Sequence, residues 1–159
     1  MTSDSGQALV AVDEEGTPVP ARTPDLRRLL AYWDEKRGAR RFPGRADIDP
    51  IDLRFMLDRI ALIEVHDQGR RFKLRVVGSW WSRKFGFEPT GIWLEDWPNP
   101  EQMQLTLKSY EKLLVLRRPV LLHRDEWVEG TMLSYEAILL PLSDDDDRIS
   151  MIVAGNGGG

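Results

Sequence analysis

The chain has 159 residues, which is the size of one domain with a substantial core. Hydrophobic residues make up 42% of it and charged residues 30%, and the formal net charge of −4 disfavours nucleic-acid binding, because that function usually needs a basic excess. The absence of cysteine excludes disulfides, thiolate metal sites and cysteine nucleophiles. The polar, acidic N-terminus is unlike a signal peptide, and no apolar run approaches the roughly twenty residues of a membrane span, so we expect a cytoplasmic protein.

The first part of the chain is expected to hold a disordered segment and then a helix. Residues 1–22 mix Gly, Pro, Ser and acidic residues without periodicity, which predicts disorder. Thr23-Pro24-Asp25 is a typical helix start. The apolar residues that follow recur at helical spacing and predict an amphipathic helix from Pro24 to Arg37, packed on the sheet or on a second copy; they are Leu26, Leu29, Leu30 and Trp33.

The middle of the chain predicts a hairpin followed by helices. A short helix begins at Asp49-Pro50, and strands over 59–66 and 71–77 flank a turn at Asp67-Gln68-Gly69. Gly78 ends the second strand, residues 79–85 form a short helix, and Asn99-Pro100 starts a longer one.

The remainder predicts three strands, over 120–127, 132–140 and 149–154, and a flexible tail over 155–159. Strands grouped on either side of helices favour an α+β domain with an antiparallel sheet, here a single domain over 23–154.

The order of these elements is similar to that of a PAS domain, and short motifs strengthen the likeness over about Thr23 to Ala154. The sequence most resembles a divergent bacterial subfamily of short, mostly stand-alone PAS proteins. Two segments depart from its pattern, Ser79-Trp80-Trp81 and Asp144 to Asp147. The matching motifs are Leu30-Ala31-Tyr32-Trp33 before Lys36-Arg37-Gly38, Ala46-Asp47-Ile48-Asp49-Pro50, Phe72 to Gly78, Phe85-Gly86, Thr90-Gly91, and Tyr135-Glu136 leading to Pro141-Leu142.

The resemblance implies five antiparallel strands with helices inserted between the second and third, curved around a cavity. Apolar pockets with a few polar groups are typical ligand sites, and the middle of this chain is rich in aromatic residues. The alternative is that these rings only fill the core. Arg75 and Glu136 are candidate polar anchors, or a cross-strand pair. The candidate pocket residues are Leu74, Val76, Trp80, Trp81, Phe85, Trp93, Trp97, Tyr110 and Tyr135.

Other chemistry finds less support. His66 and His123 are the only histidines and are candidates for haem ligation or for ordinary surface use. The Asp144 to Asp147 run lacks the spacing of a calcium loop, so we expect a solvated turn and no metal site. No nucleophile elbow or phosphate loop is present, so we expect no enzyme activity.

The function that these observations favour is a stand-alone sensory or regulatory protein that binds a small ligand or a protein partner and signals through association. The resemblance implies a homodimer, with Leu26, Leu29, Leu30 and Trp33 as the candidate dimer or partner surface. The alternatives are a ligand-free interaction module and a haem- or flavin-binding sensor. No cofactor is required by the sequence, and its identity, like that of a ligand or partner, is left open.

Overall fold

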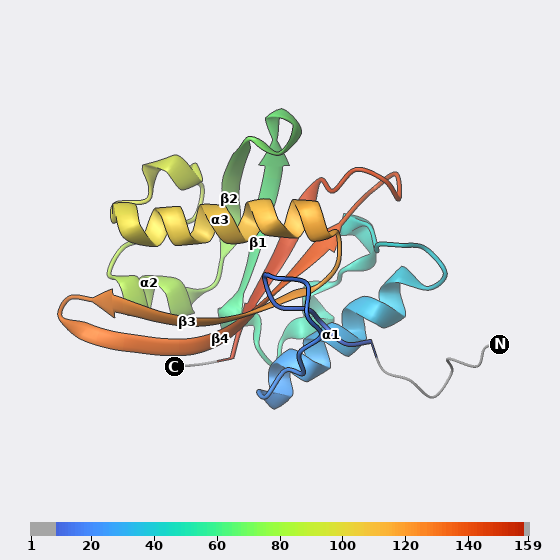
Figure 1. The fold of residues 1–159 in the computed structure, drawn as a ribbon, viewed down its shortest axis with the longest axis horizontal. Coiled ribbons are helices and arrows are strands. Elements are labelled where there is room, and N and C mark those ends of the chain that lie inside the picture. The colour runs from blue at the N-terminus through green and yellow to red at the C-terminus, as the bar shows by residue number, and fades with distance from the viewer. Residues whose placement is uncertain (1–8, 158–159) are drawn as a thin grey trace.

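A computed structural model describes residues 9–157 of the chain. Figure 1 shows one sheet with helices packed on it. The α-helices are α1 (Pro24–Arg37), α2 (Ser79–Phe85) and α3 (Pro100–Leu116). The strands are β1 (Ile60–His66), β2 (Arg71–Val77), β3 (Val120–Val128), β4 (Thr131–Leu142) and β5 (Met151–Asn156). Short 3₁₀ helices are η2 (Arg45–Asp47), η3 (Pro50–Leu53), η4 (Leu57–Arg59), η5 (Asp67–Gly69) and η6 (Leu94–Asp96).

The sheet has the strand order β2-β1-β5-β4-β3, and every neighbouring pair is antiparallel. The helices α2 and α3 lie in the chain between β2 and β3. The predicted α+β class and the predicted insertion of helices between the second and third strands are therefore confirmed.

The sheet carries an apolar layer on each of its two faces, because successive side chains of a strand point to opposite faces. One layer joins the sheet to α1 and to the segment from residue 42 to 56. The other joins the sheet to η6 and α3 and includes Ile63, Phe72 and Leu113. We call these the α1 face and the α3 face. The α3 face is the one that the inserted helices cover, and it holds most of the predicted pocket residues.

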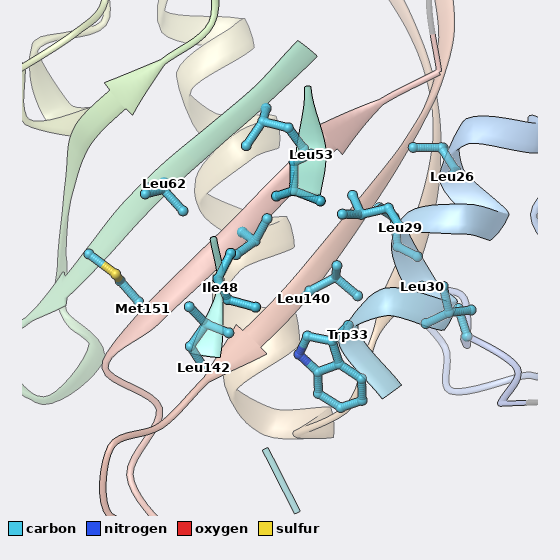
Figure 2. Packing of buried hydrophobic residues seen from close by; sticks show 14 of the residues in the cluster. Leu26, Leu29, Leu30, Trp33, Ile48, Leu53, Leu62, Leu140, Leu142 and Met151 are labelled. Atoms are coloured by element: carbon cyan, nitrogen blue, oxygen red, sulfur yellow. The ribbon is translucent and has the colours of Figure 1, made fainter. Parts of the chain in front are cut away.

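The apolar stripe of α1 packs on the sheet of its own chain. Figure 2 shows Leu26, Leu29 and Trp33 pointing from α1 toward the strands of the sheet. Leu30 packs in the same apolar layer, and all four residues are buried. The indole of Trp33 also donates a hydrogen bond of 2.8 Å to the backbone oxygen of Pro141. The prediction that these four residues form a dimer or partner surface is wrong, because the core of the same chain already covers them.

Residues 9–22 differ from the predicted disordered segment. Val12 is fully buried and bridges to both Pro18 and Val120. Its N–H donates to Pro119 O at 3.0 Å, and its oxygen accepts from Leu121 N at 2.8 Å. This segment covers the beginning of the β3 edge, where composition alone gives no sign of pairing. Residues 1–8 lie outside the described part of the chain.

The C-terminal tail begins later than predicted. Gly155 and Asn156 belong to β5 and pair with Ile60 and Ala137, respectively. A Cβ atom at Gly155 would lie 2.5 Å from a methyl carbon of Leu29, so a larger residue there would force the Leu29 side chain to move. The flexible-tail prediction is therefore wrong for residues 155 and 156, while residues 158–159 are not described.

Candidate functional site

A chain of aromatic rings links α2 to the sheet and to the segment before α3. Trp80 meets Trp81, Phe85 and Tyr135 edge-on, with centroid distances of 5.2, 6.0 and 5.1 Å. Phe85 in turn contacts Trp97 at 5.4 Å. Edge-to-face pairs of this kind stabilise by about 0.5–1.5 kcal/mol beyond the area that they bury. These five residues, here called the aromatic cluster, were all predicted as pocket residues.

The start of α2 packs closely against η4. Gly78 directly precedes α2, and a Cβ atom on Gly78 would lie 2.2 Å from the backbone oxygen of Asp58. Only glycine allows this approach. Farther along α2, Arg83 forms an ion pair of 3.2 Å with the Asp58 carboxylate, and we call these two contacts with Asp58 the α2–η4 joint. The position of α2 is thus tied to η4.

A carboxylate lies buried beside the aromatic cluster. Glu126 on β3 is 6% exposed, and the hydroxyl of Tyr135 donates a hydrogen bond to it. Burial raises the pKa of Tyr135 far above its ordinary value, and the neighbouring Glu126 carboxylate raises it further. A buried carboxylate is uncommon in an apolar core because its desolvation is costly. Glu126 is therefore the most distinctive polar group of the α3 face.

Three further polar contacts lie at the α3 side of the site. The Trp97 indole donates to the side-chain oxygen of Gln102 at 2.8 Å, and the Gln102 amide donates to Trp127 O at 3.3 Å. The guanidinium of Arg124 donates to Ser109 Oγ on α3. Gln102 and Arg124 thus fasten α3 to β3, and the contact of Trp97 with Gln102 connects the aromatic cluster to α3.

Two other predicted pocket residues, Leu74 and Tyr110, lie in the apolar layer of the α3 face. The ring of Tyr110 lies 5.2 Å from that of Phe72, and burial raises the Tyr110 pKa well above its usual value. Leu74 belongs to the sheet and Tyr110 to α3, and neither makes a ring contact with Trp80.

The structure places Val76 and Trp93 elsewhere. A bulge between Leu62 and Ile63 makes β1 skip Arg75, so Leu74 lies on the α3 face and Val76 pairs with Leu62 on the α1 face. Val76 is 48% exposed. Trp93 lies against the outer side of β2, where the Arg71 guanidinium stacks 3.8 Å from its ring centre. Neither belongs to the aromatic cluster.

The two predicted polar anchors do not meet. Arg75 lies on β2 and Glu136 on β4, and the sheet order puts β1 and β5 between them. Arg75 forms an ion pair of 2.9 Å with Glu64. The Glu136 carboxylate accepts hydrogen bonds from the backbone N–H groups of Arg22 and Thr23, the latter at 2.9 Å, at the start of α1. Both residues therefore stabilise the fold outside the aromatic cluster.

The histidines lie outside the aromatic cluster as well. His66 contacts Glu64 at 2.8 Å and the ring of Trp93 at 5.0 Å. The side chain of His123 is 69% exposed and lies 3.4 Å from Asp125. Within residues 9–157 no group of three or more potential metal-ligating side chains comes together. Among the described helices, none is both long enough and apolar enough to cross a membrane.

Sequence reasoning missed Glu126, Arg124 and Gln102. Strand alternation offered a signal for the first two, because both share the parity of Val120 and Leu122, which face α3. A charged residue at an inward position is the feature to look for in such a strand. Gln102 gave no comparable signal, since the same residue type also fits a helix start.

An antiparallel sheet of five strands, with helices between the second and third strands, is the α+β architecture of a PAS domain. A sequence model of the PAS domain family matches residues 21–154, and the chain belongs to this family. PAS domains are in general sensory, non-enzymatic signalling modules.

Comparison with solved structures gives a match to the PAS domain of BvgS from Bordetella pertussis. The two share 15% sequence identity at a TM-score of 0.46, over 62% of this chain and 74% of the other. No curated protein sequence matches the chain.

Proposed function

We propose that the chain is a sensory domain that binds a small ligand between α2 and the β3–β4 hairpin and signals by changing its association with a partner. The observation that carries this proposal is the buried Glu126 carboxylate, which accepts a hydrogen bond from Tyr135 and lies beside the aromatic cluster. A few fixed polar groups within aromatic walls are typical of small-molecule sites.

The packing suggests how ligand binding would be transmitted. A ligand beneath α2 would move that helix, which is fastened to η4 through Gly78 and Asp58. The same joint borders an apolar groove of about 440 Å³ on the α1 face, lined in part by Leu57, Leu62 and Val76. A shift of α2 would therefore change the shape of an exposed apolar surface. Exposed apolar patches of this kind are common partner sites.

Native mass spectrometry of the freshly purified chain tests ligand binding. We expect a retained small molecule, and we expect Ala137→Leu to prevent its retention because Ala137 is buried on the α3 face beside Tyr135. Ala31→Leu, on the exposed side of α1, is the matched control and should retain the molecule. A molecule bound equally by all three proteins contradicts the proposed site.

The second candidate function is a ligand-free interaction module. The close ring contacts of Trp80 favour it, because side chains fill much of the space that a ligand would need. It predicts no retained molecule and no thermal stabilisation by any member of a small-molecule library, whereas the sensory proposal predicts both.

A further inference from the structure

Two buried polar groups near the aromatic cluster have no hydrogen-bond partner among residues 9–157. They are the indole Nε1 of Trp80 and the side-chain amide nitrogen of Asn156, and each residue is 2% exposed. Buried donors are nearly always paired, because an unpaired one retains its full desolvation penalty. Such exceptions ask for an explanation, and here there are two in one region.

Strand register places the two donors around one residue, Tyr135. The Trp80 ring contacts the Tyr135 ring at 5.1 Å. Asn156 pairs with Ala137, which lies two residues from Tyr135 on the same face of β4. Alternation along β5 puts Asn156 on the α3 face with Ile152 and Ala154, whereas Gly155 faces α1. Both donors thus border the same part of the proposed site.

The chemistry of the surroundings restricts what the donors would bind. Both nitrogens are neutral, donate hydrogen bonds and cannot accept them, so each needs an acceptor atom, and a carbonyl oxygen offers two lone pairs. An anion would have to leave water for a site beside aromatic rings and the Glu126 carboxylate. An uncharged acceptor avoids both penalties.

We infer that Trp80 and Asn156 are the donor pair of this site, and that its ligand is a small, uncharged, mainly apolar molecule recognised through a carbonyl oxygen. This inference rests on the proposed function. It adds the chemical class of the ligand and the two residues that donate hydrogen bonds to it. Sequence reasoning missed Asn156 because it fell in the predicted tail.

Three probes of similar size test the inference: acetophenone, which carries an uncharged carbonyl; cumene, which lacks oxygen; and benzoate, which is charged. Each is titrated into ¹⁵N-labelled full-length chain while the tryptophan indole signals are followed. The signal missing from Trp80→Phe identifies Trp80. We expect acetophenone to bind more tightly than either other probe and to move the Trp80 indole signal.

Two variants separate recognition from folding. Trp80→Phe keeps an aromatic ring without its N–H, and Asn156→Leu replaces the amide by an apolar group of similar size. Each is expected to lower acetophenone affinity about tenfold more than it lowers cumene affinity, because only acetophenone uses the lost N–H group. Asn156→Leu is also expected to keep or raise the melting temperature, since it removes an unpaired buried donor. It serves as the test if Trp80→Phe does not fold.

The outcomes distinguish this inference from the proposed function. If cumene binds as tightly as acetophenone, or benzoate binds more tightly, the carbonyl inference is wrong while a small-molecule site beneath α2 stands. Acetophenone affinity that neither variant alters also overturns the inference. If none of the probes moves the Trp80 signal, the inference and the proposed site both fail.

Discussion

At the scale of single residues, Glu136 shows how one carboxylate joins distant parts of the chain. It lies on β4 and accepts hydrogen bonds from the N–H groups of Arg22 and Thr23, which precede α1. Burial alone would raise the pKa of Glu136, but the backbone hydrogen bonds outweigh it and hold the pKa below its ordinary value. The bonded form in the folded chain is therefore the charged one.

This pKa shift gives a pH-dependent prediction. Because the folded-state pKa is lowered, the stabilisation is present above the unfolded value of about 4.3 and is lost as the pH falls through the folded value. We expect Glu136→Gln to lower the free energy of unfolding by about 1.5 kcal/mol at pH 7 and by much less near pH 3. Urea unfolding at both pH values measures the difference.

The control for Glu136→Gln is Glu111→Gln on the exposed side of α3, which removes the same charge and should leave stability unchanged. An equal loss at pH 7 and pH 3 for Glu136→Gln would show that the carboxylate does not act through its charge.

Single residues were also the hardest feature to predict from sequence. The aromatic pattern of residues 79–85 indicated that Trp80 and Trp81 cannot both face inward from one helix, but it did not show that Trp80 is the buried one. The sequence also did not predict the position of Val76. A bulge at Arg75 reverses the alternation of β2, and no residue type in that strand indicates a bulge. The predicted pairing of Arg75 with Glu136 is wrong, because it depends on the order of the strands in the sheet, which local sequence does not indicate.

At the scale of elements, α1 is an integral part of the core. Leu29 is 1% exposed and packs closely over Gly155 on β5. We expect Leu29→Ala to lower the free energy of unfolding by about 3 kcal/mol through lost burial and the cavity left behind. Val115→Ala on α3 is the matched control, since Val115 is 75% exposed and should change stability little. Thermal unfolding of both variants decides whether α1 packs as described.

The segment before α1 gives a second prediction at this scale. Val12 is fully buried at the β3 edge, whereas Val10 is 41% exposed. Val12→Ala should therefore lower the free energy of unfolding by about 2 kcal/mol, and Val10→Ala by less than about 0.5 kcal/mol. Chemical denaturation compares them. If both changes were neutral, residues 9–22 would be loosely attached, as their composition predicts.

Periodic elements were predicted well from sequence because periodicity reports burial directly. The helices around Leu29 and Leu113 and the first four strands appear where the pattern placed them, and β5 begins and ends two residues later than predicted. Residues 9–22 were missed because their order comes from backbone pairing with Pro119 and Leu121, far along the chain. Glycine- and proline-rich composition is compatible with such pairing but does not predict it.

At the scale of the whole molecule, the sheet is shared by two apolar layers, so both faces depend on the same strands. The homodimer stays a prediction from the family resemblance. Because the α1 stripe is buried, a dimer would have to use another surface, and charged substitutions at Leu29 or Trp33 should unfold the chain and not simply separate two copies. Light scattering of the unaltered chain is expected to give the mass of a dimer, and a monomer would contradict this prediction.

The proposed function depends most on where the ligand binds. A crystal structure of the chain with the molecule that native mass spectrometry detects, or with acetophenone, tests that location directly. We predict electron density between α2 and β4, in contact with Trp80 and Tyr135. Density found instead in the groove beside Leu57 and Val76 on the α1 face, with the aromatic cluster unchanged, would contradict it.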